Sequence, residues 1–176
     1  MKVISSTERF KSNIFTVTED HAVDSDGFEI HRVIVQHNGS AVMMPMDSKG
    51  RILLVRQFRL PARKAMWELA AGRIDPGEKP LQAARRELKE ETGYTARTWK
   101  KLLSFYPSPG YVAEKMTIFL ATNLTDGDSA PMEDERIETR WFKPKEIDEW
   151  IRSGKIQDGK TIIGFLAWKR YAKGVK

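Results

Sequence analysis

The most constraining feature of this 176-residue sequence is the segment from Gly72 to Tyr94, which reads GRIDPGEKPLQAARRELKEETGY. Its second half carries apolar residues at 81, 84 and 88, the spacing of one helical face. Proline at 80 suits a first helical turn, and glycine at 93 suits a helix end. The segment therefore predicts a glycine-containing loop followed by a helix over residues 81–92.

Three glutamates crowd the last part of this predicted helix. Glu87, Glu90 and Glu91 fall at i, i+3 and i+4, so their side chains share one face. Like charges at this spacing destabilise a helix by roughly a few tenths of a kcal/mol per pair, and those in the last turn also meet the negative end of the helix dipole. A divalent cation reverses this conflict, because Mg²⁺ and Mn²⁺ prefer hard carboxylate oxygens. The alternative is a solvated acidic face, balanced by the neighbouring basic residues.

The whole segment fits the pattern G-x5-E-x7-R-E-U-x-E-E-x-G-U, in which U is a bulky apolar residue. It resembles the Nudix box at every fixed position, with a mild departure at the last one, where a smaller aliphatic residue is common. The matching residues are Gly72, Glu78, Arg86, Glu87, Leu88, Glu90, Glu91, Gly93 and Tyr94. The resemblance implies an α/β fold, the Nudix α/β/α sandwich, in which the loop-helix-loop box binds a divalent metal.

The resemblance also implies which box residues hold the metal. Glu87 and Glu91 are the expected direct ligands, Glu90 the ligand of a second ion or of its water, and the backbone carbonyl of Ala71 a further ligand. We expect two or three Mg²⁺ ions, with Mn²⁺ as a possible substitute.

Two other box residues receive supporting roles from the same resemblance. Arg86 is expected to orient a carboxylate, and Glu78 to brace the loop against the helix. An arginine–glutamate pair on a helix is often only a surface pair, and that alternative stays open for both residues.

Segments on either side of the box indicate a branch of the family. Residues 56–59 (RQFR) and 67–72 (WELAAG) resemble segments of ADP-ribose pyrophosphatases and related nucleotide-sugar hydrolases, with Ala70 where a proline is usual. The Ser-Pro-Gly at 108–110, whose proline lies fifteen residues past Tyr94, resembles the proline signature of that branch. The substrate-contacting residues that these segments imply are Arg56, Arg59, Glu68, Ser108, Pro109 and Gly110. Strand alternation places the two arginines on opposite faces, so we expect one of them to contact the diphosphate.

The expected general base is Glu114, which follows the Ser-Pro-Gly segment where this branch carries a glutamate that reaches the attacking water. Glu135 and Glu138 are the fallback bases. The alternative for Glu114 is an exposed loop carboxylate at the start of a strand.

The remaining sequence predicts a mixed sheet flanked by helices. Residues 41–46 and 51–59 are expected to form a hairpin of the main sheet, joined by the turn signal at 47–50. We divide the chain into an N-terminal antiparallel strand extension over residues 1–40, expected to contribute to a homodimer, and a hydrolase domain over residues 41–176. Further predicted strands are 15–18, 28–36, 116–121 and 137–142, and further predicted helices are 144–151 and 161–171.

Composition narrows the possible partners. A net charge of +6 suits an anionic ligand, but the basic residues are spread along the chain, which argues against nucleic acid as a partner. No apolar run approaches the roughly 20 residues of a membrane span, and the first residues lack a secretory pattern, so we expect a cytoplasmic protein without membrane insertion. The absence of cysteine excludes thiolate metal sites and thiol nucleophiles.

These observations predict Mg²⁺-dependent hydrolysis of the diphosphate of ADP-ribose or a related nucleoside diphosphate sugar, giving a nucleoside monophosphate and a sugar phosphate. Specificity for GDP-mannose or another nucleotide sugar is the nearest alternative. A triphosphatase or RNA-end pyrophosphatase and a non-catalytic module that senses ADP-ribose are the others.

Overall fold

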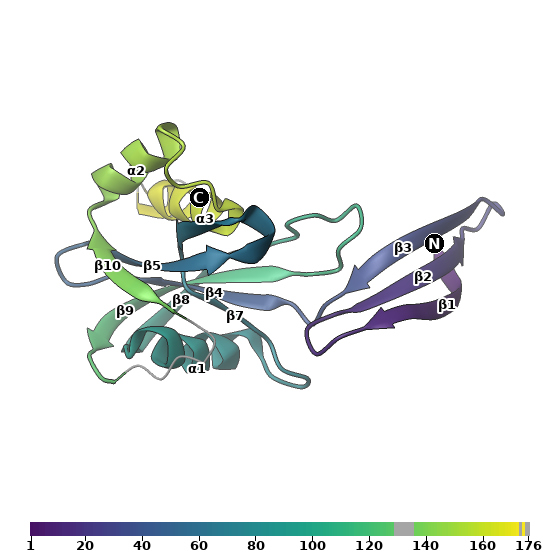
Figure 1. The fold of residues 1–176 in the computed structure, drawn as a ribbon, viewed down its shortest axis with the longest axis horizontal. Coiled ribbons are helices and arrows are strands. Elements are labelled where there is room, and N and C mark those ends of the chain that lie inside the picture. Colours follow the sequence, from purple (N-terminus) through teal and green to yellow (C-terminus); the bar gives the residue numbers. More distant parts are fainter. Residues whose placement is uncertain (129–135, 173, 175–176) are drawn as a thin grey trace.

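The computed structural model describes residues 1–128, 136–172 and 174. Within these residues, three sheets and three α-helices build a mixed α/β fold (Figure 1). The predicted fallback base Glu135 lies outside the described residues. No helix within them has the length and apolar character needed to cross a membrane.

The N-terminal strands form a sheet of their own that extends away from the rest of the molecule (Figure 1). Its order is β1-β2-β3, with both pairings antiparallel. The strands are β1 (Lys2–Lys11), β2 (Thr16–Val23) and β3 (Glu29–Gln36). We refer to this sheet as the arm.

The body of the molecule holds a mixed sheet and a second, antiparallel sheet. In the mixed sheet, of order β7-β4-β9-β8, only the central β4–β9 pair is parallel. Its strands are β4 (Ser40–Pro45), β7 (Ala71–Arg73), β8 (Thr95–Phe105) and β9 (Met116–Thr125). The second sheet, of order β10-β5-β6, contains β5 (Ile52–Arg59), β6 (Lys64–Glu68) and β10 (Glu138–Phe142), and the short 3₁₀ helix η1 (Leu60–Ala62) joins β5 to β6.

The helices α1 (Pro80–Thr92), α2 (Pro144–Arg152) and α3 (Gly159–Ala172) enclose the sheets from two sides, with α1 on one side and α2 and α3 on the other (Figure 1). Strand β4 is buried along its whole length, and its side chains alternate between the two layers. Ala41 and Met43 join the core under α1, while Val42 and Met44 join the core that holds Phe165 of α3. A strand covered on both faces is apolar at every position, which explains its continuous run of small and apolar residues.

The predicted hairpin of residues 41–46 and 51–59 is wrong in one respect. The turn forms, because Asp47 accepts hydrogen bonds from the backbone N–H groups of Lys49 and Arg51, at 3.0 and 2.8 Å. The flanking strands, however, enter different sheets and meet only at an isolated bridge between Met46 and Ile52. Strand β4 pairs with β7 and β9, whereas β5 pairs with β6 and β10. The turn therefore joins two sheets instead of closing a hairpin.

Candidate active site

The box helix α1 turns two of its glutamates into the body of the protein. Glu87 and Glu91 are 9% and 6% exposed, on the same side of the helix as the core residues Ala84 and Leu88. The helix ends at Gly93, whose φ of 76° lies in the left-handed region and whose N–H donates to the carbonyl of Lys89. That conformation favours glycine, which accounts for the glycine at this box position.

Gly72 of β7 makes room for the Glu87 carboxylate. A Cβ atom at position 72 would lie 1.8 Å from Cδ of Glu87 and 2.1 Å from its Oε1. These separations are far inside van der Waals contact, so the Glu87 side chain can occupy this place only because residue 72 has no side chain. The pairing of a loop glycine with a helix glutamate is therefore a steric requirement of this packing.

Arg86 ties the helix to the loop that precedes it. Its Nε and Nη2 atoms donate to the two carboxylate oxygens of Glu78, at 3.2 and 3.0 Å, and Nη2 also donates to the carbonyl of Arg73 at 3.0 Å. Its Nη1 atom donates to Oε1 of Glu87 at 2.7 Å and to Oε2 of Glu90 at 3.2 Å. One guanidinium thus fixes the loop and positions two of the three helix carboxylates.

The charges of this cluster shift the pKa of its members in opposite directions. Hydrogen bonding from Arg86 holds the pKa of the Glu78 carboxyl below its ordinary value, and the backbone N–H of Asp75 adds to the effect. Hydrogen bonds to Glu78 and then to Glu87 raise the pKa of the Arg86 guanidinium. Both shifts favour the charged forms, so the bracing pair is an ion pair at neutral pH.

Glu114, the expected base, is held by residues that sequence patterns did not indicate. Ser40 Oγ donates to Glu114 Oε1 at 2.5 Å, and His37 Nδ1 lies 3.8 Å from the same oxygen. The Glu114 side chain is 18% exposed, so it is not the exposed loop carboxylate of the alternative interpretation. The position of Ser40 depends on Gly39, because a Cβ atom at 39 would lie 2.7 Å from the carbonyl oxygen of Lys115.

Sheet register brings Glu114 and the box to the same end of three neighbouring strands of the mixed sheet. Ser40, the first residue of β4, pairs with Arg73 of β7 on one side and with Met116 of β9 on the other. Arg73 in turn supplies the carbonyl that Arg86 binds. Glu114 is therefore connected to the loop of the box by a few successive contacts, which pass through Ser40 and Arg73.

The loop over residues 106–115 rests on the end of the arm. Val35 of β3 donates its N–H to the carbonyl of Tyr111 at 2.8 Å and accepts a hydrogen bond from the N–H of Ala113 at 2.9 Å. A turn at Ser108, whose carbonyl accepts from the N–H of Val112 at 3.0 Å, shapes the loop. Pro109 and Gly110 line a cavity of about 530 Å³ together with Tyr106, Tyr111, Val112, Ala113 and the β3 residues Arg32 and Ile34.

Three other predicted contact residues are already engaged within the protein. Arg56 donates to Glu138, the second fallback base, at 3.1 Å across the β5–β10 pair. Arg59 donates to Glu68 at 2.8 Å, and Lys160 of α3 binds the other oxygen of Glu68. Glu68 is 1% exposed, so its carboxylate joins β6 to α3 from a buried position.

The donor set at the box fits a hard divalent cation. Glu87, Glu90 and Glu91 offer carboxylate oxygens on one helical face, and the carbonyl of Ala71 adjoins the glycine against which Glu87 packs. Oxygen donors of this kind suit Mg²⁺ or Mn²⁺ better than soft metals. Gly72 leaves the space that the Glu87 carboxylate occupies, and a bulkier residue there would displace one of these oxygen donors.

Comparison with known proteins shows which family this chain resembles. The NUDIX domain family model matches residues 36–162. The chain is 32% identical to an ADP-ribose pyrophosphatase of Bacillus subtilis (strain 168), over 99% of this chain and 97% of that protein. It is 35% identical to a GDP-mannose pyrophosphatase of Yersinia enterocolitica, over 77% of this chain and 75% of that protein. A solved structure described as an ADP compounds hydrolase has a TM-score of 0.85 at 22% identity, covering 99% of this chain and 96% of its own, a likeness that shows the fold alone.

The chain therefore belongs to the NUDIX domain family, and it is a Nudix hydrolase with that family's α/β/α fold and an added antiparallel arm.

Proposed function

We propose that this protein hydrolyses the diphosphate of ADP-ribose or a related nucleoside diphosphate sugar in a Mg²⁺-dependent reaction, giving a nucleoside monophosphate and a sugar phosphate. The observation that carries the proposal is the complete set of box carboxylates, with Glu87 and Glu91 buried on one helical face and Arg86 bound to Glu87. ADP-ribose is the first candidate because the ADP-ribose pyrophosphatase relative matches over nearly the whole chain, arm included. The proposed setting is the cytoplasm, on the sequence evidence alone.

The box residues bind and place the cation in this proposal. Glu87, Glu91 and the carbonyl of Ala71 hold it, and Glu90, the more exposed of the three glutamates, holds a second ion or its water. When bound, Mg²⁺ neutralises charge on the diphosphate and lowers the pKa of water. Arg86 keeps Glu87 and Glu90 in place by donating to both. Mn²⁺ is the expected substitute, because it accepts the same oxygen ligands.

Glu114 is the proposed general base. Ser40 fixes one oxygen of its carboxylate, which limits rotation and leaves the carboxylate aimed in one direction. The carboxylate takes a proton from the water that attacks phosphorus, and a placed base of this kind typically contributes about 10²–10⁴-fold to the rate. Glu138 is a weaker candidate, because it is bound to Arg56 at the surface of another sheet.

The proposed substrate contacts divide into direct and indirect ones. The Arg56 and Arg59 side chains are 47% and 40% exposed. Arg56 can contact a diphosphate by exchanging its partner Glu138. Arg59 binds Glu68 through Nε, so its Nη groups can contact a diphosphate while that bond is kept. Glu68 is buried, so we propose that it positions Arg59 and does not itself reach the substrate. The loop containing Ser108, Pro109 and Gly110 is proposed to contact the nucleotide, because Pro109 and Gly110 line a cavity beside the arm.

The arm is proposed to pair with a second copy of the chain, which makes residues 1–40 a dimerising extension and residues 41–176 the hydrolase domain. Every residue of β1 is exposed, including apolar side chains that a monomer would leave in water. These are Val3, Ile4 and Phe10, exposed by 54–56%, joined by Val33 of β3 at 58%. Light scattering coupled to size-exclusion chromatography tests this: a dimer mass is expected, and a monomer mass at all concentrations contradicts it.

The test of the reaction is a competition among substrates. The purified protein is incubated with ADP-ribose, GDP-mannose, UDP-glucose and a nucleoside triphosphate, with and without Mg²⁺, and products are separated by chromatography. Mg²⁺-dependent loss of ADP-ribose with formation of AMP and ribose 5-phosphate is expected. Loss of GDP-mannose first would move the specificity to the second candidate, which the Yersinia relative favours. Loss of the triphosphate alone would contradict the proposal.

A variant of a box glutamate tests whether the observed turnover depends on the box. Glu91→Gln keeps the size of the side chain and removes its charge, so turnover is expected to fall below detection while ADP-ribose binding persists. The control is Glu19→Gln, which makes the same change in a surface carboxylate of the arm that pairs with Arg9. This variant is expected to leave turnover unchanged.

A further inference from the structure

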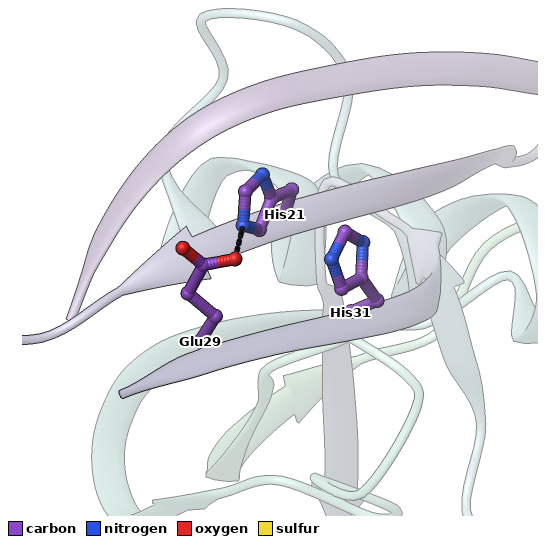
Figure 2. A group of neighbouring side chains, drawn as sticks. All are labelled: His21, Glu29 and His31. Carbon is purple, nitrogen blue, oxygen red and sulfur yellow. Dashed lines mark hydrogen bonds and ion pairs between the residues drawn. The ribbon is translucent and has the colours of Figure 1, made fainter. Parts of the chain in front are cut away.

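A cluster of imidazole and carboxylate groups lies on the arm, which the box and its chemistry do not involve. His21 of β2 and His31 of β3 face each other directly in the antiparallel register. Glu29 lies two residues before His31 and therefore on the same face of the sheet, diagonally opposite His21. Figure 2 shows the three side chains on one side of the two strands.

The three side chains already contact one another. The imidazole rings are stacked, with centroids 4.2 Å apart and planes 9° from parallel. His21 Nε2 lies 2.9 Å from Glu29 Oε2, at hydrogen-bond distance. Each residue offers one ligand atom, and the three atoms lie within 4.8 Å of one another.

We propose that His21, Glu29 and His31 form a binding site for a transition-metal ion, of which Zn²⁺ is the first candidate. Two imidazoles and a carboxylate are a common ligand set for zinc, and imidazole nitrogen favours Zn²⁺, Ni²⁺ and Cu²⁺ over Mg²⁺. This proposed site therefore differs from the box in its location on the arm and in the kind of metal ion that its ligands favour. Three protein ligands leave a fourth tetrahedral position for water or another group.

Binding requires the three side chains to rearrange. Zinc bonds of about 2.0–2.2 Å in a tetrahedron place neighbouring ligand atoms roughly 3.4 Å apart. The 2.9 Å separation of His21 and Glu29 must then widen by about half an ångström, and the His31 nitrogen must approach by at most about 1.4 Å. The stacked imidazole rings must also turn apart, because the lone pair of each ligating nitrogen lies in the plane of its ring and two nearly parallel planes cannot both contain one ion. His31 and Glu29 are exposed side chains, so rotation about their own bonds is the movement that the site requires.

The strand pairing makes the site more than a chance meeting of mobile side chains. Cross-strand partners in an antiparallel pair have Cβ atoms about 4.5–5.5 Å apart, so the backbone holds both imidazoles near the spacing that a shared ion requires. The same face carries a second carboxylate, Glu19, but this one is bound by Arg9 through two hydrogen bonds. A cation on this face would thus find the Glu29 carboxylate and not that of Glu19.

The test is calorimetric titration of the whole protein with ZnCl₂ in a large excess of Mg²⁺, which fills the hard oxygen site of the box. One Zn²⁺ per chain is expected for the parent protein. His21→Ala, His31→Ala and Glu29→Gln are expected to weaken this binding at least tenfold, since loss even of groups that only support metal ligands costs about 10–100-fold. Glu19→Gln, the matched carboxylate control, is expected to bind Zn²⁺ like the parent.

A second pair of measurements separates this site from the box. Zn²⁺ binding that persists in Glu91→Gln and is lost in His31→Ala supports the proposal. The reverse pattern, or the same affinity in all arm variants, assigns the zinc to the box and overturns it, as does a parent protein that takes up no Zn²⁺. Far-ultraviolet circular dichroism checks that each variant is folded. Zn²⁺ should raise the Tm of Glu91→Gln, as it does for the parent protein, and should leave the Tm of His31→Ala unchanged.

Discussion

The steric fit between Gly72 and Glu87 yields the sharpest prediction. In Gly72→Ala the new methyl group would lie 1.8 Å from Cδ of Glu87, whereas ordinary contact begins near 3.4 Å. The carboxylate must therefore move by about 1.6 Å, the difference between these two distances. The φ of Gly72 lies outside the left-handed region, so alanine causes no backbone strain and the effect is confined to the side chain.

Activity is expected to suffer much more than stability. Misplacement of a catalytic group by about 1 Å can cost 10²-fold, so kcat/KM should fall at least about 100-fold, or about 2.7 kcal/mol of transition-state stabilisation. The displaced atoms all belong to the one side chain of Glu87, so the free energy of unfolding should fall by an amount near the lower end of the ~1–3 kcal/mol typical of overpacking. For a chain of this length, that lowers Tm by about 2–4 °C.

Steady-state kinetics with ADP-ribose across a range of Mg²⁺ concentrations, with thermal unfolding of the same samples, measures both effects. Gly159→Ala is the matched control, because its Cβ meets nothing within 4 Å and its φ is also ordinary. The control should keep parental kinetics and stay within about 0.5 kcal/mol in stability. A Gly72→Ala protein with kcat/KM within about threefold of the parent would refute the role of Glu87 as a placed ligand.

Three further predictions concern other groups of the structure. Glu114→Gln should lower kcat by about 10²–10⁴-fold with little change in KM, and an unchanged kcat would remove it as the base. Lys160→Met should reduce the unfolding free energy by about 3–5 kcal/mol in urea titrations, because it leaves Glu68 buried beside Arg59 alone; a loss below 1 kcal/mol would contradict this. The pKa of Glu78 is lowered by Arg86, so its contribution to stability is present above the ordinary value of 4.5 and is lost as pH falls below it. Urea titrations should accordingly show Glu78→Gln less stable than the parent at neutral pH and the gap closing below about pH 4.5; a gap independent of pH would count against the Arg86–Glu78 pairing.

Prediction from sequence succeeded where the signal was local or continuous. The box helix was expected over residues 81–92 and runs from Pro80 to Thr92, because apolar spacing, a first-turn proline and a terminal glycine all lie within the segment itself. Strand β3 was likewise expected at 28–36 and spans Glu29–Gln36. The short strands β6 and β7 and the fully exposed β1 were not predicted, because little in their own residues separates them from loops. They are strands because a neighbouring strand supplies the hydrogen bonds. The longer strand β8 was not predicted either.

Sequence by itself determined the chemistry of the box. The spacing of Glu87, Glu90 and Glu91 places three carboxylates on one helical face, and this follows from helix geometry alone. Only the tertiary structure decided what those groups and the expected base would meet. Ser40 binds Glu114 across 74 positions of sequence, and Lys160 binds Glu68 across 92. Such contacts depend on which strands pair and in which register, and the order of residues within a short segment carries no direct record of either.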